Sequence, residues 1–231
     1  MKILSITTTH RICGCAVSED ENVLAETVFE GYRSCVEELT GRISETLEKA
    51  GLSDKSLGAV AVDIGPGGLT GLKIGVVTAK TIAQVRGLPV VGLSSFDILA
   101  AGALADAPPE FGRVAAIIHS SRDEFYLSLL RRSGGGFETV EPGACLKIEE
   151  IERKREGWEE PTCVTGGGVE KLGWEPVEGK LVLAPADGCF PRPSAACRLA
   201  AAALREGRGR RFDEVAPLYV SLTGAEKNLA R

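Results

Sequence analysis

The feature that most constrains the fold is a glycine-rich segment, residues 65–75, which reads G-P-G-G-L-T-G-L-K-I-G. It follows a short apolar run, residues 59–64, and precedes a longer run with helical spacing. Glycine permits tight turns and close approach of the backbone to a ligand or to another segment. A helix N-terminus is in addition a natural anion site. The segment therefore predicts a strand–loop–helix unit of an α/β fold.

Two interpretations of this loop are open from its local chemistry. One is a phosphate or partner contact made by Gly65, Gly67, Gly68, Thr70 and Gly71. The other is a tight turn that lets the helix pack closely. A P-loop is excluded because no G-K-[ST] closes the pattern.

Strand and helix patterns occur in a similar order in the two halves of the chain. In the first half we expect strands at 3–8, 12–18, 23–29, 59–64 and 88–93, and helices at 34–51, 69–86 and 95–105. In the second half we expect strands at 113–119, 125–130, 139–147 and 162–165, and helices at 148–155 and 194–205, the last capped by Ser194.

Two β-β-β-α-β-type halves predict an actin-like α/β protein (the ASKHA, ribonuclease H-like class), with a duplicated β-β-β-α-β-α fold and two lobes. Ala107-Pro108-Pro109 is typical of a boundary. We therefore expect an N-terminal lobe over residues 1–106 and a smaller, less regular C-terminal lobe over residues 107–231.

The helix predicted over residues 34–51 has signals at both ends. Ser34 and Glu37 match the S-x-x-E capping box, and Gly51 supplies a left-handed stop. Its polar side carries the i,i+4 pairs Glu38–Arg42 and Glu45–Lys49. Its apolar residues share one stripe, namely Val36, Leu39, Ile43, Leu47 and Ala50.

The next helix has apolar residues on two faces, which indicates burial on two sides. One face carries Leu72, Val76, Ala79 and Ala83, and roughly the opposite face carries Ile74, Thr78 and Val85. The second face packs either on the preceding helix of the same chain or on another protein, and the pattern favours neither.

Composition narrows the function classes. The chain has 27 basic and 32 acidic residues and a net charge of −5, which argues against binding nucleic acid on its own. No run of 18 apolar residues and no signal peptide are present, so we expect a soluble, cytoplasmic protein that does not engage a membrane. Seven scattered cysteines are typical of reduced thiols.

The residues that catalysis would need are sparse. His10 and His119 are far apart, no H-E-x-x-H pair exists, and no G-x-S-x-G elbow is found. Actin-like phosphotransfer would use a carboxylate in the first hairpin, but residues 6–10 carry none, and Asp63 is the next acidic strand end. Gly166-Gly167-Gly168 is either a phosphate cradle or a plain turn. We predict no catalytic residue and no metal site.

The glycine segment and its flanking elements resemble the TsaB family, also called YeaZ, whose loop usually reads G-P-G-S-F-T-G-L-R-I-G. The resemblance continues through Ala79-Lys80, residues 89–95 and the helix over 34–51. The late Pro217-Leu218-Tyr219-Val220 is similar to the P-x-Y-L ending of the family. The likeness is strong over residues 1–105 and weak over most of the remainder.

The resemblance implies an actin-like bacterial subunit that pairs with a TsaD-type catalytic subunit and a TsaE-type ATPase. Together they attach a threonylcarbamoyl group to the adenosine next to the anticodon, so this chain would meet tRNA only through the complex. Homodimers through the same surface would compete. No cofactor would bind tightly, and ATP or ADP would sit, if at all, at a subunit junction. Carried over, the partner surface is formed by Val36, Leu39, Ile43, Leu47, Leu72, Lys73, Val76 and Lys80.

The chain departs from the family pattern at its usual carboxylates. Thr7 and His119 replace the aspartates of I-D-T-S and I-D-A-R, and Gly68 and Leu69 replace Ser and Phe of the loop. These losses weaken nucleotide chemistry and leave the partner surface intact. A non-catalytic partner subunit is the first hypothesis and an ATP-dependent phosphotransferase of the actin-like superfamily is the second. A metalloprotease, the third, is favoured only by an older glycoprotease label of the group.

Overall fold

The structure is a computed structural model, and it describes residues 1–31, 35–106, 110–133, 136–185 and 188–220. The capping role predicted for Ser34 and the boundary at residues 107–109 lie outside these residues. No helix in the described part of the chain is long and apolar enough to cross a membrane.

The first half builds a five-stranded sheet of order β3-β2-β1-β4-β5. The three opening strands are antiparallel because short links join them, whereas β4 and β5 run parallel to β1 after helical crossovers. The strands are β1 (Lys2–Thr7), β2 (Ile12–Glu19), β3 (Asn22–Glu30), β4 (Ala59–Asp63) and β5 (Val90–Leu93).

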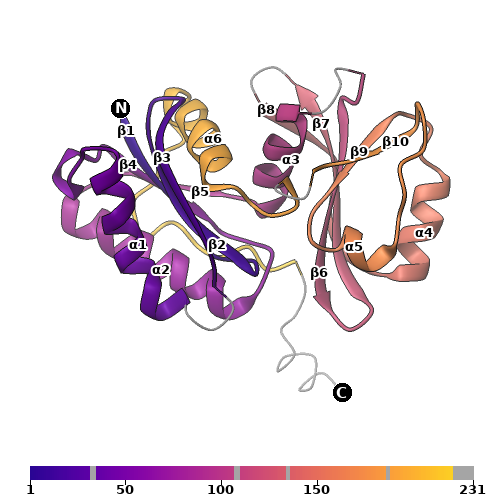
Figure 1. Cartoon of the computed structure of the whole chain (residues 1–231), viewed down its shortest axis with the longest axis horizontal. Helices are drawn as coiled ribbons and strands as arrows, with labels where there is room; N and C mark the ends of the chain where they lie inside the picture. The colour runs from indigo at the N-terminus through magenta and orange to yellow at the C-terminus, as the bar shows by residue number, and fades with distance from the viewer. Residues whose placement is uncertain (32–34, 107–109, 134–135, 186–187, 221–231) are drawn as a thin grey trace.

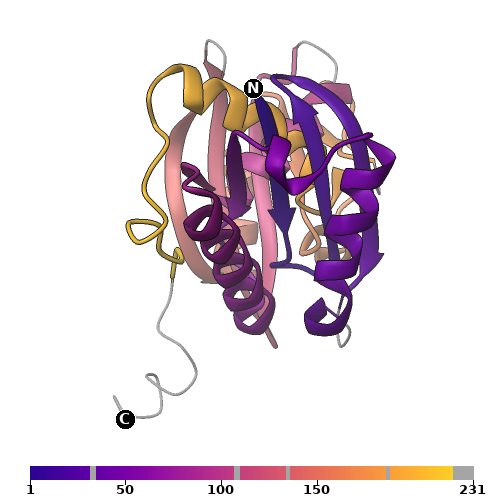
Figure 2. The ribbon, with the colours of Figure 1, turned by 90° about the vertical axis from the view of Figure 1, so that its left-hand side faces the viewer.

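Two helices cover the outer face of this sheet, α1 (Cys35–Lys49) against β2 and β3, and α2 (Leu69–Arg86) mainly against β4. Figures 1 and 2 show them side by side. A 3-10 turn, η1 (Asp54–Ser56), follows α1. The two ion pairs predicted along α1 are present, with Arg42 2.8 Å from Glu38 and Lys49 2.7 Å from Glu45.

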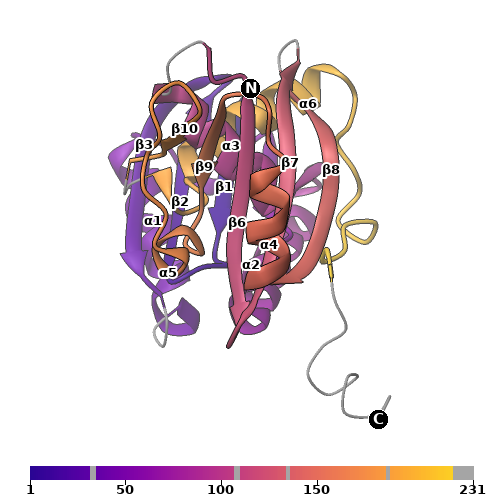
Figure 3. The same ribbon diagram turned by 90° about the vertical axis from the view of Figure 1, so that its right-hand side faces the viewer.

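The second half repeats the plan. Its sheet has the order β10-β9-β6-β7-β8, so β6, β7, β8, β9 and β10 correspond to β1 through β5. The strands are β6 (Arg113–Ser121), β7 (Glu124–Ser133), β8 (Gly136–Lys147), β9 (Thr162–Thr165) and β10 (Leu181–Leu183). The helices α4 (Ile148–Glu156) and α5 (Val169–Leu172) lie on its outer face, as Figure 3 shows. The predicted duplication is confirmed, with α5 a remnant of the position that α2 fills.

The two remaining helices fill the space between the sheets (Figure 1). The helix α3 (Ser95–Asp106) comes from the first half but packs mainly on β6 and β9. The helix α6 (Pro193–Arg205) comes from the second half but packs on β1 and β2 of the first sheet. The lobes therefore exchange these helices across the predicted sequence boundary, which itself stays a prediction.

Two local predictions need correction. Ser194 is not the cap of α6, because the helix begins at Pro193 and Arg192 is the N-cap. The N–H of Ser194 instead donates a hydrogen bond to the Glu26 carboxylate of β3 at 2.9 Å. The short elements β10 and α5 were not predicted, since three or four residues are too few to show a period.

Candidate functional site

The predicted partner surface lies only in part on the outside of α1 and α2. Five of its eight side chains are buried in the core of the chain itself, at 1–7% exposure: Leu39, Ile43, Leu47, Leu72 and Val76. Val36 is 66% exposed, Lys73 is exposed, and Lys80 is half-buried with Nζ donating to the Val215 carbonyl at 3.0 Å. The apolar stripe on each helix thus marks the side that packs on the sheet.

The outward sides of the same helices form two rows at i,i+4 spacing, which we call the outer face. It carries apolar and small polar side chains, with Val77 62% and Val85 75% exposed and Lys73 as its one charge, and the exposed Glu48 continues the α1 row at its end. It consists of Val36, Thr40 and Ser44 of α1 and Lys73, Val77, Thr81 and Val85 of α2. The second stripe predicted on α2 therefore includes one side chain, Val85, that meets solvent, while Ile74 packs on the core.

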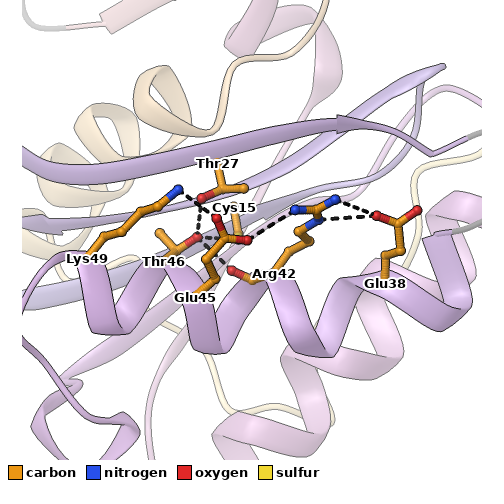
Figure 4. A network of polar contacts seen from close by, with 7 residues as sticks. All are labelled: Cys15, Thr27, Glu38, Arg42, Glu45, Thr46 and Lys49. Carbon is orange, nitrogen blue, oxygen red and sulfur yellow. Dashed lines mark hydrogen bonds and ion pairs between the residues drawn. The ribbon is translucent and has the colours of Figure 1, made fainter.

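A polar network holds α1 in place beneath this face (Figure 4). The Thr46 hydroxyl donates to its own helix at the Arg42 carbonyl and contacts Thr27 of β3 at 2.8 Å and the Cys15 thiol of β2 at 3.2 Å. Arg42 bridges Glu38 and Glu45 along the helix. The helix is thus fixed to two strands by buried hydroxyl contacts.

The glycine loop lies against the turn that follows β1. A β-carbon at Gly67 would lie 2.4 Å from the Thr9 carbonyl oxygen, and one at Gly71 would lie 1.9 Å from that of Thr8. The Gly68 N–H donates to the Thr9 carbonyl at 2.7 Å. The geometry thus accounts for these two glycines by close packing within the chain, while a phosphate contact by Gly65, Gly67, Gly68, Thr70 and Gly71 stays a prediction.

A buried polar cluster lies beside the loop, where β1, β4 and β5 end. The Asp63 carboxylate accepts the Ser95 hydroxyl at 2.6 Å, the Gly65 N–H at 2.9 Å, and the Thr9 hydroxyl. The Thr9 oxygen is also 2.7 Å from Nδ1 of His10. Burial raises the pKa of Asp63 to about 6, against the three hydrogen bonds that lower it.

The same buried environment shifts the pKa of His10 in the opposite direction. Part of the residue reaches solvent, but Nε2 is sealed from it and has no hydrogen-bond partner among the described residues. Burial lowers the pKa of His10 to about 4 because a low-dielectric setting disfavours the charged imidazolium. Thr9, His10 and Ser95 were not singled out as site residues, and the serine pair after β5 is the one signal that could have found Ser95.

The two positions where the family usually has aspartate are structurally unlike. The Thr7 side chain is buried, and its hydroxyl lacks a partner in the described part of the chain. His119 lies near the end of β6, with Nε2 3.0 Å from the Arg122 carbonyl and 3.3 Å from Lys171 Nζ. Its ring also meets Phe125 edge-on.

The glycines after β9 repeat the packing seen in the first lobe. Gly166 has φ +103°, and a β-carbon there would lie 2.2 Å from the Ile117 carbonyl oxygen. Within the described residues, no group of three or more His, Cys, Asp or Glu side chains is placed to hold a metal ion.

Comparison with known proteins identifies the family of the chain. Residues 23–167, well over half of it, match the family model TsaD, described as tRNA N6-adenosine threonylcarbamoyltransferase. The chain belongs to the TsaD family. Within this family, its resemblance to the TsaB/YeaZ proteins is confirmed by the individual relatives.

TsaB of Escherichia coli, named a tRNA threonylcarbamoyladenosine biosynthesis protein, is 28% identical over 99% of this chain and 98% of its own length. TsaB of Bacillus subtilis is 29% identical over 62% of this chain, which spans 60% of that relative.

Solved structures confirm the two-lobed actin-like fold. YeaZ from Pseudomonas aeruginosa superposes with a TM-score of 0.79 at 24% identity, covering 94% of this chain and 99% of that one. The activator of 2-hydroxyisocaproyl-CoA dehydratase from Clostridium difficile, solved with bound ADPNP, superposes with a TM-score of 0.54 at 11% identity, over 95% of this chain and all of that one.

Proposed function

We propose that this TsaD-family chain is a non-catalytic partner subunit in the threonylcarbamoylation of adenosine next to the tRNA anticodon. It would bind a TsaD-type catalytic subunit and work with a TsaE-type ATPase, and tRNA would be contacted through the complex. The name of the E. coli relative supports the pathway. The observation that carries the partner role is the outer face of α1 and α2.

Two properties of the outer face support a protein partner. It exposes three valines, at 62–75%, on neighbouring helices that are otherwise well packed. It carries one charge, Lys73, with Glu48 at the end of its α1 row, whereas the polar side of α1 carries the ion pairs. Apolar rows with few charges resemble the buried centre of protein interfaces. The same properties would permit a homodimer, which would then compete with the heterodimer.

The test is size-exclusion chromatography with light scattering on the chain, on a TsaD-type subunit of the same organism, and on their mixture. Val77→Glu and Val36→Glu place a charge on the outer face without touching the core. We expect a one-to-one complex that each substitution weakens at least tenfold, because a charge buried without a partner is costly.

Val177→Glu is the matched control, because Val177 is 48% exposed on the other lobe and should leave association unchanged. Failure of the wild-type chain to associate, with or without ATP and tRNA, would refute the partner role. Charges at Ile43 or Val76 are unsuitable for this test because both side chains are buried.

ATP-dependent phosphotransfer is the second candidate, favoured by the fold shared with the ADPNP-bound activator. Asp63 is the strand-end carboxylate that such chemistry would use, and it is fully buried and already accepts three hydrogen bonds. Nucleotide at a subunit junction is compatible with the partner role. Magnesium-dependent ATP turnover by the isolated chain would favour the second candidate over the first.

A further inference from the structure

Two cysteine side chains meet where α1 begins. Cys13 lies on β2 and is 2% exposed, and Cys35 is the first residue of α1 and is 4% exposed. Gly31, which has no side chain, lies beside both: a β-carbon there would lie 2.9 Å from the β-carbon of Cys13 and 3.4 Å from that of Cys35. The two thiols therefore share one small buried space.

The thiols also interact with each other. Their side chains are within hydrogen-bonding reach of each other, which raises the pKa of Cys13 and lowers that of Cys35 despite its burial. The carbonyls of Thr8 and His10, at 3.7 and 3.5 Å from the Cys13 sulfur, are the backbone acceptors within reach of the same thiol. Cys35 is thus the thiol of the pair that more readily becomes the nucleophilic thiolate.

Other buried cysteines are placed differently. Cys15 makes its contact with the Thr46 hydroxyl at 3.2 Å, and Cys197 donates to the Ser5 hydroxyl at 3.2 Å. Cys15 is therefore a close neighbour in sequence whose thiol is committed elsewhere, which makes it a useful control.

We propose that Cys13 and Cys35 are a thiol–disulfide site that a hydroperoxide oxidises and a dithiol reduces. Cys35 gives up its proton, its thiolate attacks an oxygen of hydrogen peroxide, the O–O bond breaks, and the leaving hydroxide takes up that proton to become water. The resulting sulfenic acid is attacked by the Cys13 sulfur, so that an S–S bond forms and the S–O bond breaks. The second hydroxide takes the Cys13 proton, and two electrons have passed from the thiols to the peroxide.

The disulfide would tie the first turn of α1 to β2, directly beside Val36 of the outer face. It would close a loop of 23 residues, counting from Cys13 to Cys35, within one lobe. The inference is independent of the proposed partner role, since the bond can be detected on the chain alone.

The experiment treats the full chain with hydrogen peroxide, blocks free thiols with iodoacetamide without reduction, and maps tryptic peptides by mass spectrometry. Trypsin places Cys13 and Cys15 in peptide 12–33 and Cys35 in peptide 34–42. We expect these two peptides to be linked after oxidation and separated again by dithiothreitol. Cys13→Ser and Cys35→Ser should each abolish the link, and Cys15→Ser should retain it.

Two results would overturn the proposal. Peroxide could leave the two peptides unlinked in the wild-type chain, or the link could persist in Cys13→Ser and so belong to Cys15. The Cys15→Ser protein decides the question alone if Cys13→Ser does not fold, because its peptide 12–33 retains a single cysteine.

Discussion

At the scale of single residues, one hydroxyl connects two titratable groups. The Thr9 oxygen contacts both Asp63 and Nδ1 of His10 and has one hydrogen to donate. When Asp63 is ionised, Thr9 donates to it, so Nδ1 of His10 must carry a hydrogen and Nε2 is left bare. When Asp63 is protonated, the carboxyl can donate to Thr9 and Thr9 can donate to His10. The tautomer of His10 is thereby coupled to the charge of Asp63.

Asp63→Asn is predicted to remove one pH dependence of stability. The folded carboxyl keeps its proton up to pH about 6, whereas its ordinary pKa is 3.8. Between these values the folded state binds more protons, so stability falls as pH rises, by about 3 kcal/mol in total. Asparagine matches the neutral carboxyl: its oxygen can accept from Ser95 and Gly65, and its amide can donate to Thr9. Urea unfolding at pH 7 should find the variant at least as stable as wild type.

His10→Asn is predicted to remove a pH dependence of stability that has the opposite sign. The unfolded imidazole is protonated near its ordinary pKa of 6.5, but the folded one only near 4. Stability from neutral His10 is therefore complete above pH 6.5 and falls as the pH drops toward 4, by about 3 kcal/mol. The asparagine variant should resist acid better than wild type in urea titrations at pH 4 to 7.

The two effects oppose each other between pH 4 and pH 6 in the wild-type chain. In the Asp63→Asn variant, stability should therefore fall more steeply than in wild type as the pH is lowered from 6 to 4. In the His10→Asn variant, stability should rise relative to wild type over the same change of pH. If both variants follow the wild-type curve within error, the pKa values of these groups are close to ordinary and the coupling through Thr9 is absent.

At the scale of elements, two helical glycines allow a matched comparison. A β-carbon at Gly71 of α2 would lie 1.9 Å from the Thr8 carbonyl oxygen, while one at Gly41 of α1 would meet nothing within 4 Å. Gly41→Ala should raise stability by about 0.5–1 kcal/mol through helix propensity. Gly71→Ala should lower it by about 2 kcal/mol or more, because backbone must shift. Thermal and urea unfolding measure both, and equal changes of the same sign would contradict the close-packing explanation of the loop.

The same elements show how far sequence patterns reach. Helical spacing predicted α1 and α2. It also predicted the apolar stripe of each helix, which contains Leu39 and Ile43 on α1 and Leu72 and Val76 on α2. It could not say what the stripe faces, because an apolar row looks the same whether a sheet or a partner covers it. Val77 escaped notice since it stands alone beside Val76, and only its 62% exposure distinguishes it.

The cluster around Asp63 was harder to predict for a related reason. Its members come from the ends of β1, β4 and β5 and are separated by up to 86 positions. Each is an ordinary polar residue in its own segment. Only the strand order, which short-range periodicity does not contain, brings them together.

At the scale of the whole molecule, α6 is anchored to the first sheet by one carboxylate. Glu26 of β3 accepts from Arg192 at 2.5 Å and from the Ser194 N–H at 2.9 Å. Burial alone would raise the pKa of Glu26, but these bonds outweigh it and the pKa is lowered below its ordinary 4.5. The stabilisation is therefore present above pH 4.5 and is lost as the pH falls through the folded pKa.

Glu26→Gln is accordingly predicted to lower stability at pH 7 by about 1.5–3 kcal/mol, the range for a hydrogen bond to a charged group. Glu30→Gln on the same strand is the control: its ion pair with Arg11 is 3.1 Å long, with both side chains more than 60% exposed, and should contribute less than about 1 kcal/mol. Urea unfolding compares them, and a Glu30 effect as large as that of Glu26 would contradict the anchoring role.

The whole-molecule arrangement was predicted in outline. The repeated order of strands was sufficient to predict two lobes, because each β-β-β-α-β unit has few ways to form a sheet. The exchange of α3 and α6 was not predicted, because an alanine-rich helix such as α6 carries no mark of which sheet it will meet. Their places depend on contacts nearly 200 positions apart, such as that of Ser5 with Pro193.

That exchange has a consequence for synthesis on the ribosome. Translation delivers β1 to β5 first, but the inner side of this sheet, with Ile3, Ala59, Ala61 and Val91, packs on alanines of α6. Those alanines are synthesised about a hundred residues after β5, the last strand of this sheet. The nascent chain therefore carries an uncovered apolar surface through the whole translation of the second lobe. The first lobe therefore reaches its final packing only after α6 has been synthesised.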